Sequence, residues 1–272
     1  MTHSAVVDFT SRLARQDGVV VWVHAAQGSV PREAGVWMGV LADAVAGTIG
    51  GGQLEFAAIA EARRRLGGGQ GEALQRVALG PSLGQCCGGV VELRYEPVSS
   101  ADVPALRSRL TGRATPLALF GGGHVGRALV RVLAELPFAI TWIDSRDEIF
   151  PPDVPSGVAC EHSDPVQRAV AGLAAGSQVL IMSFSHAEDL DVVAACLQRQ
   201  RLQGDLGFIG LIGSKTKWAT FRHRLEARGF TPAELAGVTC PIGLPGIAGK
   251  EPEVIAVSVA AQLLALRRER PG

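Results

Sequence analysis

The sequence has no excess charge of either sign, because 26 lysines and arginines balance 26 aspartates and glutamates. A chain with no net charge has no overall electrostatic field that would attract nucleic acid or anionic lipid. The balance therefore argues against a nucleic-acid partner. It favours a small molecule or another protein as the partner.

Long apolar runs are also missing from the sequence. The longest, at residues 178–182 and 254–266, are too short or too interrupted to cross a bilayer, so no membrane segment is expected. The first residues lack the basic region, apolar core and small-residue cleavage site of a secretory signal. We therefore expect a protein of the cytoplasm.

Cysteine is scarce and odd in number. Five cysteines in 272 residues do not make a disulfide framework, and a reducing compartment keeps thiols free. Internal repeats and low-complexity tracts are absent from the sequence as well, which excludes solenoid and disordered architectures. The chain therefore has the sequence of a globular protein, and its length favours two domains at roughly 150 residues each.

The first part of the chain contains short apolar runs separated by glycine and proline. Helical spacing over residues 5–13 precedes strand-like runs at residues 19–26, 36–41 and 45–49. A glycine run leads into an expected helix over residues 53–66, and further strands and one helix follow. We predict a smaller N-terminal α+β domain over residues 1–112.

The second part of the chain alternates apolar runs with amphipathic stretches, which is typical of βα repeats on a parallel sheet. Strands are expected at residues 117–120, 139–143, 178–183 and 207–212. Helices are expected after His124, Asp164, His186, Ser214 and Pro252. We therefore predict that residues 113–272 form an α/β domain with a doubly wound parallel sheet.

The strongest local motif follows the first of these strands and opens a helix. It is a G-x-G-x-x-G pattern formed by Gly121, Gly123 and Gly126, with His124 at the helix start. These glycines would allow a tight turn, close approach of a pyrophosphate, and close packing of helix on strand. Asp144 lies 18 residues after Gly126, where an acid usually binds a ribose hydroxyl.

This motif predicts a Rossmann-like domain that binds NAD(P) or another nucleotide. The alternative is a domain that keeps its glycines for packing and binds nothing, or that binds something other than NAD, because a fold does not fix a function. Both interpretations stay open at this point.

Polar residues follow two later strands, at the carboxyl edge where ligands of open α/β sheets bind. Ser185 and Glu188 have the spacing of a capping box, which leaves His186 and Asp189 as the candidate ligand contacts. Ser214 and Lys215 precede another helix, and a helix N-terminus with a lysine suits an anion. The alternative for these residues is a solvated helix start.

Cys86 and Cys87 lie side by side in a glycine-flanked segment, GQCCGG. A structural zinc site is not expected, because adjacent cysteines lack the C-x₂-C spacing and because Cys160, Cys196 and Cys240 do not supply a second pair. An accessible thiolate between glycines suits a soft metal or sulfur transfer, so Cys86 and Cys87 are candidate metal and cofactor contacts. The equal alternative is two small apolar residues that line a loop. Cys196 lies in an apolar helix and is expected to be buried and inert.

Taken together, the motifs resemble those of the XdhC-type xanthine dehydrogenase accessory proteins. The matching segments occur in order along nearly the whole chain, at residues 29–32, 47–55, 84–89, 120–126 with Asp144, 210–215 and 240–244. The following residues, 245–252, look like the bacterial xanthine dehydrogenase branch. Many relatives have histidine at the position of Cys240.

The resemblance implies a maturation factor rather than a turnover enzyme. Such a factor binds the molybdenum cofactor (molybdopterin), supports replacement of an oxo ligand by sulfur, and delivers the product to apo-xanthine dehydrogenase. The sulfur would come from a cysteine desulfurase partner. A homodimer is the base-rate expectation for a soluble oligomer.

Two interpretations compete with this one. The first is an NAD(P)-dependent oxidoreductase, although the sequence shows no acid–base partner at a recognisable spacing. The second is an interaction scaffold whose glycine loops are purely structural. Cofactor binding distinguishes the three.

Overall fold

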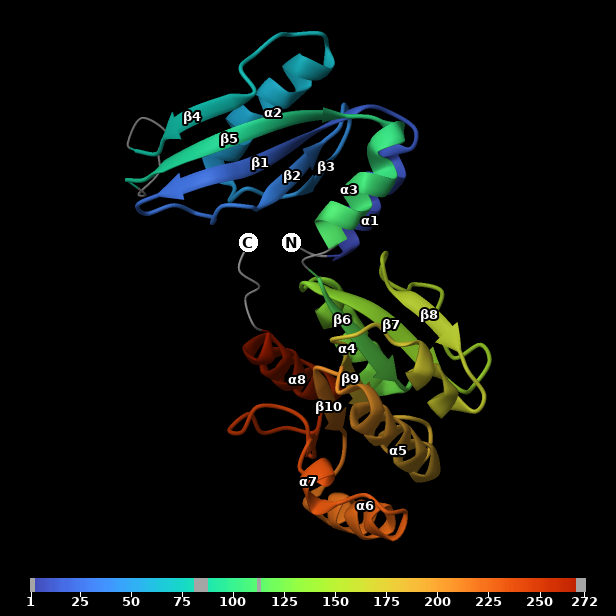
Figure 1. Cartoon of the computed structure of the whole chain (residues 1–272). Helices are drawn as coiled ribbons and strands as arrows, with labels where there is room; N and C mark the ends of the chain where they lie inside the picture. The colour runs from blue at the N-terminus through green and yellow to red at the C-terminus, as the bar shows by residue number, and fades with distance from the viewer. Residues whose placement is uncertain (1–2, 81–87, 112–113, 268–272) are drawn as a thin grey trace. The chain divides into compact units, whose positions relative to one another are not determined.

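A computed structural model describes residues 3–80, 88–111 and 114–267. The chain divides into two compact units, the first ending at Arg113 and the second beginning at Ala114. Figure 1 shows the helices and strands of each unit. Within the described residues, no helix combines the length and apolarity needed to cross a membrane.

The N-terminal unit is built on a five-stranded antiparallel sheet in the order β3-β2-β1-β5-β4. Its strands are β1 (Gly18–Gln27), β2 (Trp37–Val40), β3 (Val45–Gly47), β4 (Leu74–Ala78) and β5 (Val90–Val98). Its helices are α1 (His3–Leu13), α2 (Gly52–Leu66), the short 3₁₀ helix η2 (Ser100–Asp102) and α3 (Val103–Thr111).

Successive valines of β1 bury both faces of this sheet, because side chains alternate along a strand. Val19 and Val21 belong to the core under α2, whereas Val20 packs with Phe9 in the core under α1 and α3. A strand covered on both faces is apolar throughout rather than alternating. The expected α+β architecture of this part of the chain is confirmed.

The C-terminal unit has a six-stranded parallel sheet in the order β11-β10-β9-β6-β7-β8. Its strands are β6 (Thr115–Phe120), β7 (Phe138–Asp144), β8 (Ala159–His162), β9 (Gln178–Ile181), β10 (Phe208–Leu211) and β11 (Val238–Thr239). Read from the β8 edge, the strands follow the Rossmann order 3-2-1-4-5-6, which confirms the predicted doubly wound sheet. The order reverses between β6 and β9, and ligands of such sheets bind at this switch point.

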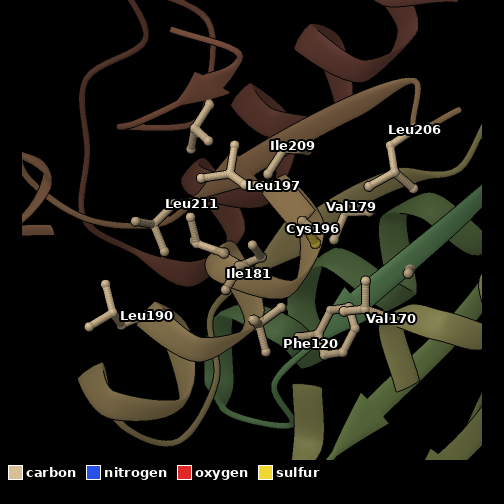
Figure 2. Close-up of a cluster of buried hydrophobic side chains, with 14 of the residues drawn as sticks. Phe120, Val170, Val179, Ile181, Leu190, Cys196, Leu197, Leu206, Ile209 and Leu211 are labelled. Atoms are coloured by element: carbon tan, nitrogen blue, oxygen red, sulfur yellow. The ribbon is translucent and has the colours of Figure 1, made fainter. Parts of the chain in front are cut away.

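Helices cover both faces of the parallel sheet (Figure 1). One face carries α4 (His124–Ala134) and α8 (Pro252–Leu266), and the other carries the 3₁₀ helix η3 (Val166–Gly172), α5 (His186–Gln203), α6 (Lys215–Ala227) and α7 (Pro232–Leu235). Figure 2 shows part of the core on the face covered by η3, α5, α6 and α7, where Cys196 lies among Val179, Ile181 and Leu197. Cys196 is fully buried, as expected, and burial raises its pKa to about 12.

The structure contains short elements that the sequence pattern does not reveal, namely β8, α7 and β11. All residues of β8 are exposed, so the strand has no apolar alternation, and it contains Cys160 opposite Trp142. Cys160 therefore lies within a strand and is exposed. The helix expected after Asp164 is η3, a 3₁₀ helix.

Gly126 determines how closely α4 packs on β6. A Cβ at this position would overlap the carbonyl oxygen of Gly121, which is backbone and cannot move aside cheaply. We expect Gly126→Ala to lower the free energy of unfolding by about 2–3 kcal/mol, as overpacking does. Urea unfolding measures the change.

The matched control is Gly123→Ala in the same loop. A Cβ on Gly123 meets no atom within 4 Å. We expect this variant to stay within about 1 kcal/mol of the parent, the usual range for a cap position. Equal stability of the two variants would contradict the packing role of Gly126.

Candidate functional site

The glycine loop between β6 and α4 has a conformation that its residues specifically allow. Gly121 has a φ of 123°, which side chains rarely adopt, and a Cβ there would overlap the Met182 carbonyl oxygen. Trp142 Nε1 donates to the Gly121 carbonyl oxygen at 2.9 Å. The loop is therefore held from two neighbouring strands.

The open end of this loop is the N-terminus of α4. Gly123 is the N-cap residue and is exposed, and no side chain caps the helix there. His124, the first helical residue, is also exposed. Because the first amides of a helix lack acceptors within the helix, this end can donate hydrogen bonds to an anion.

Asp144 lies at the end of β7, as predicted, but its carboxylate is used inside the protein. It is 1% exposed, and its Oδ2 accepts from Gly122 N at 2.5 Å and from Arg146 Nη2 at 2.9 Å. Its Oδ1 accepts from the Arg146 backbone N and Nε, both at 2.9 Å. A ribose hydroxyl would therefore have to replace one of these donors.

The pKa of Asp144 reflects two opposing effects. Burial alone would raise the pKa, whereas the hydrogen bonds from Arg146 and from the Gly122 amide lower it. The hydrogen bonds are stronger in sum, and the pKa of Asp144 lies below its ordinary value. Asp144 is therefore a charged group that orients the glycine loop and Arg146 together.

Glu188 joins the loops on the two sides of β6. Its Oε1 accepts from Ser145 Oγ after β7 at 2.7 Å, and its Oε2 accepts from Phe184 N after β9 at 3.2 Å. Ser185 caps α5, as predicted, by accepting from Glu188 N at 3.2 Å. The Glu188 carboxylate bonds to the amide before the cap instead of closing the box. The loops after β7 and β9 are thereby tied across the switch point.

A buried ion pair continues the edge toward β10. Asp189 is 2% exposed, and its carboxylate lies 2.6 Å from Lys217 Nζ and accepts from Ser183 N at 2.7 Å. Lys217 Nζ also donates to the Ile212 carbonyl oxygen at 2.9 Å. The predicted Lys215 is exposed at the start of α6. The lysine that is largely buried and paired at this edge is therefore Lys217, which was not predicted from the sequence.

A cavity of about 290 Å³ opens beside this ion pair and is lined by His186, Ser214, Thr216, Lys217, Thr220, Phe221 and Arg224. It brings the predicted residues His186 and Ser214 together. Ser214 caps α6 by accepting from Lys217 N at 3.1 Å, and the His186 ring lies edge-on to the Phe221 ring at 6.2 Å. Another cavity, of about 230 Å³, is lined by the first residues of β6 and by residues around η3, and includes no predicted site residue.

Cys240 follows β11 at the same carboxyl edge. Its Sγ lies 4.0 Å from the Ser214 carbonyl oxygen. Burial raises the pKa of this thiol, and nearby Lys217 partly opposes the rise. In the part of the chain that the structure describes, no three His, Cys, Asp or Glu side chains gather as metal ligands. Cys86 and Cys87 lie outside the described residues.

Motif loops also meet in the N-terminal unit. Gly89, just after the Cys-Cys segment, donates its N–H to the Ser29 carbonyl oxygen at 3.1 Å. A Cβ on Gly50 would lie 2.7 Å from the Pro31 ring and 3.4 Å from Arg32 Cγ, so the glycine run packs on the same 29–32 motif. Three of the motifs noted in the sequence therefore share one place in this unit.

Glu55 holds the glycine run in this arrangement. Its Oε2 accepts from Thr48 Oγ1 at 2.5 Å, from Ile49 N at 3.0 Å and from Gly51 N at 3.1 Å. The carboxylate therefore occupies the amides that the run would otherwise offer to an external anion. Arg32, which supplies the positive charge of the 29–32 motif, is exposed beside the glycine run.

Replacing Asp144 with asparagine tests its role as a charged organiser. We expect Asp144→Asn to lower the free energy of unfolding by about 1–3 kcal/mol at neutral pH, because Arg146 loses a charged acceptor. The folded-state pKa lies below the ordinary value of 3.8, so the parent has this stabilisation above that pH and loses it as the pH falls through the folded-state pKa.

Urea unfolding of parent and variant at pH 7 and at progressively lower pH measures this effect. The difference in unfolding free energy should shrink as the medium becomes acidic. A difference that is independent of pH would show that the charge of Asp144 contributes nothing.

Comparisons with known proteins agree with this organisation. A curated relative from Escherichia coli (strain K12), described as the uncharacterized protein YqeB, is 26% identical over 254 residues. The match covers 90% of this chain and 43% of YqeB, so the chain spans less than half the length of that relative. A crystal structure from Bacillus halodurans, described as a xanthine dehydrogenase, has the same fold. Its TM-score is 0.74 at 20% identity, over 100% of this chain and 97% of the other.

Family profiles match both units. The profile of the XdhC and CoxI family matches residues 11–78, in the N-terminal unit. The profile of the XdhC Rossmann domain matches residues 117–263, which is more than half of the chain. The chain belongs to the XdhC family.

Proposed function

We propose that this protein is a cytoplasmic maturation factor that binds the molybdenum cofactor, supports replacement of an oxo ligand by sulfur, and delivers the cofactor to apo-xanthine dehydrogenase. Membership of the XdhC family supports a role in xanthine dehydrogenase maturation. A cysteine desulfurase is the proposed source of sulfur. The cofactor is cargo here, bound and released rather than kept.

The observation that carries this proposal is the open N-terminus of α4 at the switch point of the sheet. Molybdopterin has a phosphate end, and this helix end offers backbone amides with no side-chain cap. Gly123 leaves space for an approaching phosphate, since nothing lies within 4 Å of a Cβ placed there. The residues present therefore fit the anionic end of the cofactor.

Sulfur exchange also needs a thiol contact, in addition to the phosphate contact. Thiolates are the protein groups that soft metals and sulfur prefer. We assign this contact to Cys86 or Cys87, which directly precede the 88–89 segment joined to Ser29. Arg32 lies exposed on the same motif and would favour a negatively charged ligand there.

A nicotinamide nucleotide is the competing ligand, because the strand order is that of dinucleotide-binding sheets. The Asp144 carboxylate already accepts hydrogen bonds from Gly122 and Arg146, and this disfavours the usual contact between such an acid and the ribose of NAD. Equilibrium binding separates the two ligands. NAD(H) affinity with turnover would support an oxidoreductase and overturn the proposed function.

Gly123→Val tests the phosphate contact. The valine side chain should block an approaching phosphate and leave the core intact, because the position is open and exposed. We expect cofactor retention to fall about 10- to 100-fold, the equivalent of losing a charged hydrogen bond. Molybdenum content per protein after purification measures retention, with Gly123→Ala as the control. A folded Gly123→Val variant that retains as much cofactor as the parent would make the loop structural.

Single Cys→Ala variants test the thiol contact. We expect Cys86→Ala or Cys87→Ala to abolish most activation of apo-xanthine dehydrogenase, whereas Cys160→Ala, at an exposed strand position, should leave it unchanged. Alkylation rates measured against pH should show the fastest thiol in the pair, as a low-pKa thiolate would. Normal activation by both pair variants together with failure of Cys240→Ala would move the site to the edge beside Ser214.

A further inference from the structure

Phe184 is an aromatic side chain that is not buried in the hydrophobic core. It lies in the loop after β9, beyond Met182 and Ser183, at the switch point, and is 66% exposed. Its backbone amide is held by Glu188, so the position of the residue is defined even though its ring is not buried. Single exposed apolar residues are common on protein surfaces, so a second structural feature is needed before a binding role can be assigned to Phe184.

That feature is Arg146, which reaches Phe184 from the other side of β6. The guanidinium carbon lies 4.6 Å from the centroid of the Phe184 ring. The guanidinium is itself fixed by its hydrogen bonds to both oxygens of Asp144, and its side chain is still 33% exposed. A planar cation and a flat ring therefore lie together, both partly open to solvent.

The same carboxylate connects this pair to the glycine loop. Asp144 accepts from Gly122 N and from Arg146, so the guanidinium has a set position relative to the start of α4. Glu188 sets the Phe184 amide relative to Ser145, the residue before Arg146. The loop, the cation and the ring come from β6, β7 and β9, which are neighbours in the sheet.

We propose that Phe184 and Arg146 form a stacking shelf for a flat, fused nitrogen heterocycle whose attached phosphate binds at the glycine loop. Such a ring stacks on an aromatic face and on a guanidinium plane alike. A pterin and a purine share this chemistry. The proposal rests on the proposed function, which puts a phosphate at the same loop, and it adds the class of ring recognised beside it.

The shelf is tested with a pair of ligands that differ only in the ring. AMP and ribose 5-phosphate carry the same phosphate, with and without a fused heterocycle, and calorimetry gives both affinities. We expect the parent to bind AMP more tightly. Phe184→Leu should lower the AMP affinity about 5- to 100-fold, the range for loss of one base–aromatic stack, and leave ribose 5-phosphate within about 2-fold. Phe184→Tyr should retain AMP binding.

Two controls keep the test specific. Leu202→Ala removes an equally exposed apolar side chain, 71% exposed, from the far end of α5 and should change neither affinity. Purification of the full chain with the molybdenum cofactor, for parent and Phe184→Leu, reports whether a pterin uses the shelf. A loss of either AMP affinity or cofactor retention in Phe184→Leu supports the shelf and identifies the ring as purine or pterin.

The outcomes separate this inference from the proposed function. Unchanged AMP affinity together with unchanged cofactor retention in Phe184→Leu overturns the shelf. A parent that binds AMP no better than ribose 5-phosphate and retains no cofactor overturns it as well. A parent that retains no cofactor but discriminates AMP through Phe184 overturns the proposed function and supports the shelf.

Discussion

The carboxylate of Asp144 is the constraint on which the carboxyl edge of the C-terminal sheet depends. It is buried, and an isolated buried charge is strongly unfavourable unless hydrogen bonds compensate it. Here the compensation comes from Gly122 and Arg146, that is, from the turn after one strand and from the loop after the next. The hydrogen bonds that this one carboxylate requires therefore fix the geometry of both loops. A ligand that contacted both loops would meet a preformed arrangement.

Similar contacts repeat along the edge between other neighbours in the sheet. Glu188 links the loops after β7 and β9, and Asp189 pairs with Lys217 between the first turns of α5 and α6. Both acids lie in the first turn of α5, where the helix dipole favours negative charge. The edge is thus a series of polar links above two apolar cores. Its chemistry lies in loops, whereas the strands beneath supply the rigidity.

The glycine loop, Asp144 and the helix starts could be predicted from the sequence, because each carries a local signal: a glycine spacing, a strand end or a capping residue. Arg146 and Phe184 could not be predicted, because they meet through a contact between loops that are far apart in the chain. Lys217 was missed for the same reason, since its partner Asp189 lies on another helix. The short β8 and β11 have too few buried residues to show a period.

The central position of β6 in the sheet limits the local fluctuations of this strand. The strand is paired on both sides, and its residues enter both cores, Leu119 one and Phe120 the other. Its amides should exchange with solvent only when the whole unit opens, whereas edge strands as short as β8 and β11 can fray at little cost. The glycine loop is thus attached to the part of the sheet least able to move. A ligand that bound at the glycine loop would therefore meet a rigid backbone, whereas local opening of this sheet should begin at its short edge strands.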